Sequence, residues 1–86
     1  MMLADYFEGA FIGVASRFDF KEPVAVYDHD RCIEILVNEH GLEEEQALEY
    51  FSYNVLGSWV GDETPVFLHR LTLDEAVSEW GQEEKK

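Results

Sequence analysis

The sequence predicts a small α+β domain that is mostly helical, with a helical hairpin, a C-terminal helix and a minimal two-stranded sheet. Two apolar runs with helical spacing lie between residues 28 and 56, a third follows a capping motif at Thr72, and two short β-rich runs flank the hairpin. At 86 residues with 47% hydrophobic side chains, the chain is long enough for one hydrophobic core and too short for two. We therefore expect a single acidic globular domain over residues 1–81 and a short charged tail over residues 82–86.

The N-terminal segment admits two interpretations. Gly9 and Gly13 each weaken a helix by about 1 kcal/mol relative to Ala, and the β-rich run of residues 11–14 fits a strand. The spacing of the apolar side chains nevertheless favours a helix over residues 3–18, and we keep the strand as the alternative. The apolar positions on the expected helix face are Leu3, Phe7, Ala10, Phe11, Val14 and Phe18.

A short strand is expected at residues 24–27, because Pro23 favours the start of a strand directly after it. Asp28 then suits the N-cap of a helix, and Gly41 suits the position just after its end. The side chains that recur at helical spacing between them are Cys32, Ile33, Leu36, Val37 and His40.

A second helix is expected to follow at once and to run to about Leu56, where Gly57 ends it. Its first turn carries three successive glutamates at positions 43–45, which suit the positive end of the helix dipole. With the preceding helix it forms a hairpin over residues 28–56. Its expected inward face consists of Ala47, Leu48, Phe51, Asn54 and Val55.

The C-terminal part predicts a second strand and a third helix. Residues 66–70 form a β-rich run that we expect to pair with residues 24–27. Thr72-Leu73-Asp74-Glu75 matches a capping box, and Gly81 suits the end of the helix that it begins. We expect the apolar face of this helix to pack against the hairpin and the sheet, with Trp80 substantially buried. The face consists of Leu73, Ala76, Val77 and Trp80.

The charge of the chain excludes several classes of partner. Nineteen acidic residues against six basic ones give a net charge of −13, and the charges of the tail cancel, so the excess lies within residues 1–81. Such a surface repels nucleic acid and anionic lipid, and attracts a basic partner over about 8 to 10 Å at physiological salt. We therefore expect no direct binding to nucleic acid or to a membrane.

The location predicted from the sequence is the cytoplasm. No apolar run approaches the roughly 18 residues of a membrane-spanning helix, and the N-terminus lacks the basic and apolar regions of a signal peptide. The lone cysteine, Cys32, fits a reducing compartment and reads as a small core residue.

No motif predicts catalysis, a cofactor or a metal site. Asp28, Asp30 and Glu39 fall at positions 1, 3 and 12 of a calcium loop. That loop also needs an oxygen ligand and a glycine, where this chain has Cys32 and Ile33. No nucleophile elbow or phosphate-binding glycine loop is present. A zinc site would require three scattered histidines to converge: His29, His40 and His69.

The carboxylates within the expected helices are spaced in a way that stability alone disfavours. A like-charged pair four residues apart destabilises a helix by about 0.2 to 0.5 kcal/mol. Its members lie about 5 to 6 Å apart, a spacing comparable to that of phosphates along a nucleic-acid strand. The pattern therefore favours a surface that imitates a nucleic-acid backbone. The pairs are Asp30 and Glu34, Glu45 and Glu49, and Glu75 and Glu79.

Four segments within residues 24–68 carry a recognisable pattern. They are Val26-Tyr27-Asp28, Ala47-Leu48-Glu49-Tyr50-Phe51, Asn54-Val55-Leu56-Gly57-Ser58-Trp59-Val60-Gly61 and Thr64-Pro65-Val66-Phe67. In this pattern the chain resembles a family of short uncharacterised proteins from bacteria and their phages. The resemblance implies a phage or prophage context and no particular activity, cofactor or catalytic residue. Glu43 stands where that family more usually has a capping serine, which exchanges a good N-cap for a negative charge.

Two functions from different classes are consistent with these observations. The first is an inhibitor that imitates nucleic acid and occupies the basic groove of a host defence complex, such as a CRISPR effector or a restriction enzyme. The alternative is a non-enzymatic assembly accessory that self-associates through exposed aromatic side chains, while its charge prevents aggregation. Solubility alone also accounts for the charge. The expected contacts of the inhibitor are Glu34, Glu44, Glu45, Glu49, Tyr53 and Trp59.

Overall fold

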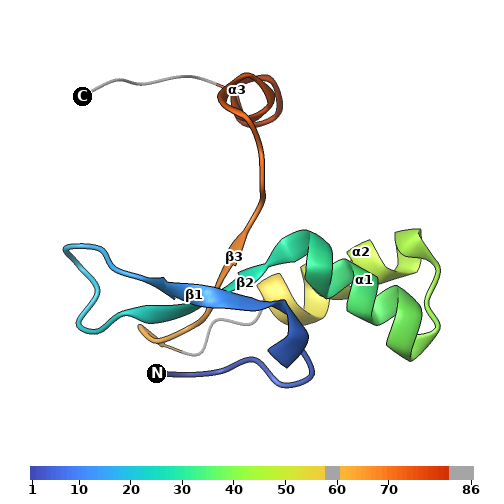
Figure 1. The fold of residues 1–86 in the computed structure, drawn as a ribbon, viewed down its shortest axis with the longest axis horizontal. Helices are drawn as coiled ribbons and strands as arrows, with labels where there is room; N and C mark the ends of the chain where they lie inside the picture. Colours follow the sequence, from blue (N-terminus) through green and yellow to red (C-terminus); the bar gives the residue numbers. More distant parts are fainter. Residues whose placement is uncertain (58–60, 82–86) are drawn as a thin grey trace.

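The computed structural model describes residues 1–57 and 61–81, so the expected tail and Trp59 lie outside the described residues. The α+β class is confirmed (Figure 1). Along the chain the elements are the 3₁₀ turn η1 (Glu8–Ala10), strands β1 (Phe11–Ala15) and β2 (Val24–Asp28), helices α1 (His29–His40) and α2 (Glu44–Phe51), the π-helical turn η2 (Ser52–Leu56), strand β3 (Val66–Leu68) and helix α3 (Leu73–Trp80).

The sheet has three strands rather than the expected two, in the order β1-β2-β3. β2 pairs with β3 in parallel, Val26 opposite Val66, which confirms the pairing expected from the sequence. The additional strand is β1, which pairs with β2 in antiparallel orientation. The expected helix over residues 3–18 is therefore wrong and the strand alternative is right. Gly13 is incompatible with the expected helix. It adopts a φ of 149°, which does not occur in a helix, and it lies at an irregularity in the pairing of β1 with β2.

The helical hairpin is confirmed, with α1 and α2 in contact. The Asp28 carboxylate accepts a hydrogen bond from the Arg31 N–H at 3.3 Å, and Gly41 ends α1 with a φ of 70°. The start of α2 is capped despite Glu43, because the Glu43 N–H donates to Gln46 Oε1 at 3.0 Å.

The inward face of the second helix matches the expectation in part. Ala47 and Phe51 are buried, whereas Leu48 and Asn54 are exposed. The π-helical geometry that begins at Ser52 explains Asn54, because it changes the spacing that would keep this residue in line with Phe51. Gly57 follows the turn, where a Cβ atom would come within 2.8 Å of the Tyr53 carbonyl oxygen, so close approach requires the glycine.

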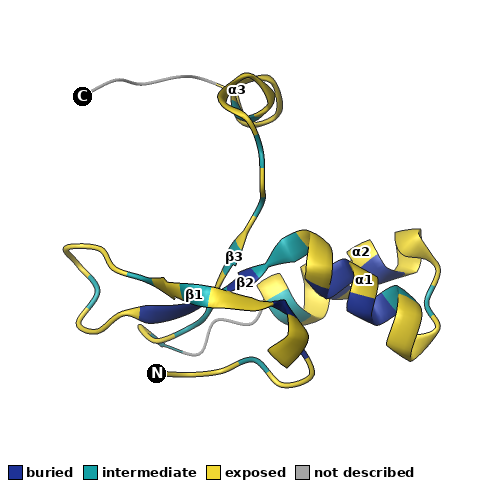
Figure 2. Ribbon diagram, viewed as in Figure 1, coloured by how far each residue is buried: buried dark blue, intermediate teal, exposed yellow. Residues whose placement is uncertain are grey.

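The core lies between the sheet and the hairpin, where the buried residues of β2, α1 and α2 meet (Figure 2). Tyr27 and Phe51 are fully buried, and Phe67 of β3 contacts both rings. Cys32 is a core residue, as expected. Burial, together with the nearby charge of Asp28, raises the pKa of the Cys32 thiol to about 12.

Helix α3 stands apart from this body (Figure 1). We expected it to pack on the hairpin and the sheet with Trp80 buried, and this expectation is wrong. None of its residues is buried, and Leu73 and Trp80 are 72% and 68% exposed. The residues after β3 lead α3 away from the sheet and the hairpin, and the Trp80 ring contacts that of His69, with centroids 5.6 Å apart. The expected capping box is present, with the Thr72 hydroxyl accepting from the Glu75 N–H at 3.2 Å.

Candidate functional site

The helical hairpin of residues 29–56 carries seven carboxylates and a single arginine. Arg31 Nη1 lies 3.3 Å from Glu34 Oε1, so one of the predicted contacts is partly neutralised. His29 Nδ1 lies 3.2 Å from Asp30 Oδ1. Among the described residues, no lysine or arginine pairs with the other five carboxylates of the hairpin. These are Glu39, Glu43, Glu44, Glu45 and Glu49.

The two remaining arginines of the body offer little compensation. Arg17 Nε lies 2.6 Å from Asp19 Oδ1, and Arg70 Nε lies 2.6 Å from Asp28 Oδ2. Both arginines are therefore already bound to carboxylates outside α2. The hydrogen bond from Arg70 holds the pKa of Asp28 below its usual value, with the Arg31 N–H adding to the effect.

The structure divides the four predicted glutamates into two pairs. Glu34 and Glu44 line one shallow depression between α1 and α2, together with Asp30. Glu45 and Glu49 stand on the outward face of α2, because each residue turns the helix by about 100° and carries them away from Glu44. The acidic side chains therefore occupy two adjoining faces of the hairpin rather than one.

The predicted aromatic contacts are accounted for in part. Tyr53 of η2 is 76% exposed and lies with Glu49 and Tyr50 around a second shallow depression. Trp59 falls among the residues that the structure does not describe. Asn54 donates a hydrogen bond to the Tyr50 carbonyl of its own helix at 3.2 Å.

The three histidines do not converge on one point. The rings of His29 and His69 stack with centroids 4.2 Å apart, whereas His40 at the far end of α1 meets the edge of Tyr6 at 5.7 Å. In the described part of the chain, no three His, Cys, Asp or Glu side chains are placed to hold a metal ion. Asp28, the first position of the rejected calcium loop, serves as the N-cap of α1.

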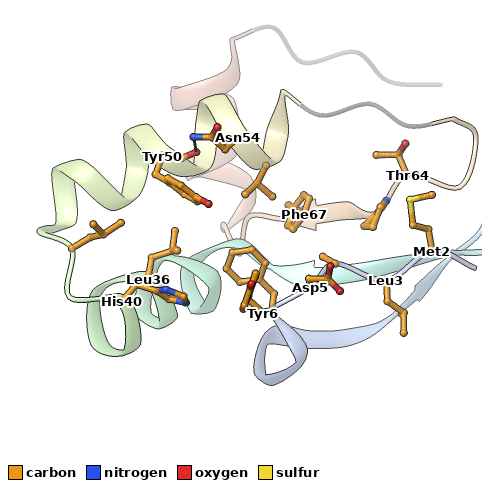
Figure 3. A pocket seen from close by; sticks show the side chains of 15 residues that line it. Met2, Leu3, Asp5, Tyr6, Leu36, His40, Tyr50, Asn54, Thr64 and Phe67 are labelled. Carbon is orange, nitrogen blue, oxygen red and sulfur yellow. Dashed lines mark hydrogen bonds between the residues drawn. The ribbon is translucent and has the colours of Figure 1, made fainter.

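A cavity of about 640 Å³ opens beside the core, between the N-terminal segment, α1, the α2-η2 helix and β3 (Figure 3). More of its lining is apolar than polar, and its polar side chains are Asp5, Tyr6, His40, Tyr50, Asn54 and Thr64. We call it the groove. Sequence reasoning missed it, because its walls come from segments far apart in the chain. The residues that define it are Leu3, Tyr6, Leu36, Leu42, Val55 and Phe67.

The N-terminal wall of the groove is fastened to the body at several points. The terminal amine lies 3.0 Å from Glu63 Oε1, and the Ala4 N–H donates to the Tyr27 hydroxyl at 2.9 Å. Tyr6 adopts a φ of 74°, a left-handed conformation that costs a non-glycine residue about 1 kcal/mol or more. The groove is therefore a formed feature of the fold rather than a gap beside a loose terminus.

The second apolar surface is the outer face of α3. Its side chains at positions i, i+3, i+4 and i+7 form one stripe, the spacing with which amphipathic helices bind in grooves. The opposite face is entirely acidic or neutral, with Asp74, Glu75 and Glu79 around Ser78. Sequence reasoning found this face and assigned it to the core. The α3 stripe consists of Leu73, Ala76, Val77 and Trp80.

Comparison with known proteins adds no relative. No family model matches the chain, and neither the curated proteins nor the solved structures contain a significant match. The described helices include none that is both long and apolar enough to cross a bilayer.

Proposed function

We propose that the protein is a phage-type inhibitor that acts in the host cytoplasm by placing its acidic hairpin in the basic groove of a nucleic-acid-binding defence complex. The observation that carries the proposal is the set of five hairpin glutamates without a basic partner among the described residues. They are held on two packed helices, so their positions are fixed before binding.

The hairpin surface contributes to the binding of a basic partner in two ways. The charge of −13 steers the partner toward the hairpin and speeds association at low salt. The exposed ring of Tyr53 beside Glu49 adds a contact that depends little on salt. Because the carboxylates replace phosphates, the inhibitor and nucleic acid compete for one groove.

The test reverses the charge of the outward pair with Glu45→Lys and Glu49→Lys. The double variant removes the repulsion between these carboxylates and keeps or raises the stability of the fold. We expect it to lose at least about tenfold in affinity for a partner captured from host lysate at low salt, and to stop displacing DNA from that partner. A second double variant, Glu34→Lys with Glu44→Lys, measures the contribution of the depression between the helices.

The matched control is Glu8→Lys with Glu22→Lys, which changes the net charge equally at exposed positions outside the hairpin. If this control weakens binding as much as the hairpin variant, the net charge acts rather than the hairpin. Simultaneous binding of the protein and DNA to the captured partner contradicts mimicry.

A second candidate, an assembly accessory that self-associates, is supported by a different observation. The α3 stripe is apolar and mostly exposed, and Trp80 contacts the body through the His69 ring, so most of the stripe is left for another molecule to cover. Salt separates the two candidates, because it weakens binding to a basic groove and does not weaken an apolar contact.

A further inference from the structure

Helix α3 has only eight residues, too few to hold its shape alone in water. Isolated helices shorter than about 12 to 15 residues are marginal even with favourable sequences. The capping box at Thr72 adds about 1 kcal/mol, which does not replace packing. No residue of α3 is buried within its own chain, although the Trp80 ring contacts that of His69 with centroids 5.6 Å apart. Most of the apolar surface of this helix is therefore left uncovered by the described part of the chain.

The chain itself contains a surface of the required kind. The groove is open, mostly apolar and bordered by fixed walls. A helix of eight residues is about 12 Å long, so the α3 stripe presents a short row of anchors of which Trp80 is the largest. In Figure 1, α3 lies above the sheet and the N-terminal wall of the groove lies below it, with residues 69–72 leading the helix away. Helix α3 therefore lies away from the groove of its own chain and does not line it.

We propose that the occupant of the groove is α3 from a second copy of this chain, and that two copies exchange their α3 helices reciprocally. A twofold axis makes both contacts equivalent, as in domain-swapped dimers. The inference deepens the self-association candidate and is independent of the acidic hairpin.

The area of contact suits a stable dimer. Leu73, Val77 and Trp80 offer about 350 Å² of exposed surface, and the groove covers them with a similar area. Two reciprocal contacts then bury about 1,400 Å² in total, within the range of roughly 1,200 to 2,000 Å² for specific interfaces. A single unreciprocated contact of half that size falls below the range.

Charge gives the exchange a distinctive response to salt. Each copy carries a net charge of −13, so the two bodies repel each other. The Debye length falls from about 10 Å at 0.1 M salt to about 3 Å at 1 M, which screens this repulsion. The dimer should therefore become tighter as NaCl is added, whereas binding of the acidic hairpin to a basic partner becomes weaker.

The experiment is sedimentation velocity of the full chain at 0.15 M and 1 M NaCl over a range of concentrations. Trp80→Ser removes the largest anchor, and Leu3→Glu places a second carboxylate in the groove in addition to Asp5. Both side chains are largely exposed, at 68% and 61%, so the folded body is retained and its NMR spectrum confirms this. Each variant should raise the dimer Kd at least about 30-fold. Ser78→Ala and Ser16→Glu are the matched controls on the opposite face of α3 and away from the groove, and leave Kd unchanged.

Mixing the two variants tests reciprocity. A mixed pair contains one intact contact, formed by the α3 of the groove variant and the groove of the α3 variant, whereas each variant alone contains none. The mixture should therefore associate more tightly than either component. A mixture that associates no better than its components, or a dimer that both variants leave intact, overturns the exchange while self-association stands. A parent chain that remains monomeric at 1 M NaCl and millimolar concentration overturns both.

Discussion

Helices α1 and α3 carry the same signals in the sequence, but α1 packs in the core and α3 is exposed. Each begins at a side-chain N-cap, Asp28 or Thr72, repeats apolar residues at helical spacing and ends at a glycine. α1 buries four of its residues, and α3 buries none. The comparison teaches that periodicity identifies the face of a helix that requires cover and says nothing about which molecule covers it.

The difference between the two helices lies in how each is joined to the sheet. β2 continues into α1 without a linker, since Asp28 is both the last strand residue and the N-cap. The direction of the strand therefore places α1 beside the core. Between β3 and α3, residues 69–72 intervene and project from the sheet. Arg70 in this segment binds Asp28 at 2.6 Å, which fastens the base of the projection and leaves the helix outside.

The largest expected effect on stability is the difference between truncating one aromatic residue in the core and one in α3. Phe51→Ala removes a fully buried ring that contacts Phe7, His29 and Phe67, and should cost about 3 to 5 kcal/mol of unfolding free energy. Trp80→Ala at concentrations where the chain is monomeric should cost less than about 0.5 kcal/mol. Urea unfolding followed by circular dichroism measures both. Equal shifts of the midpoint would show that α3 is part of the cooperative core.

A smaller effect distinguishes the two N-caps. Asp28→Ala removes the cap of α1 and the partner of Arg70, and should lower the unfolding free energy by about 1 to 2 kcal/mol. Thr72→Ala removes a cap of similar local strength, yet in the monomer it should leave the urea midpoint unchanged and only speed hydrogen exchange of the α3 amides. A midpoint that falls equally in both variants contradicts the independence of α3.

The smallest effect concerns pH. The hydrogen bond from Arg70 lowers the pKa of Asp28 in the folded chain. Such a carboxyl contributes stability above its unfolded pKa of about 3.9, and loses it as the pH falls through the lower, folded pKa. The unfolding free energy should therefore decline below about pH 4, and Asp28→Asn should flatten this decline. The pKa of Glu75 is also lowered, mainly by the Thr72 N–H, but Glu75→Gln should leave the profile of the body unchanged because the hydrogen bonds of Glu75 go to Thr72 at the start of its own helix.

The sequence predicted local structure better than the arrangement of elements. Asp28, Gly41 and the Thr72 capping box fixed helix ends correctly, because caps act within a few residues. At the N-terminus the sequence favours a helix over the observed strand, because six apolar residues fit a helix face while pairing with β2 depends on a distant segment. The burial of Trp80 was mispredicted for the same reason.

The candidate site shows the same limit. The hairpin glutamates were identified as exposed carboxylates, but their division between two faces follows from the helix phase of Glu44 relative to Glu45. The groove had no signal at all, since no local pattern relates Leu3 to Val55 or Phe67. Surfaces built from several distant segments can be identified only from the tertiary structure.

The most direct measurement of the central claim, that α3 is covered by another copy, is intermolecular paramagnetic relaxation. Ser78→Cys offers an exposed thiol on the face of α3 opposite the stripe, while buried Cys32, with its pKa of about 12, stays unreactive. A spin-labelled copy without ¹⁵N is mixed with an unlabelled ¹⁵N copy at 1 M NaCl. The exchange predicts broadening of amides at Leu3, Tyr6 and Tyr50 in the ¹⁵N copy. Broadening confined to α3 of the ¹⁵N copy, or none at all, contradicts it.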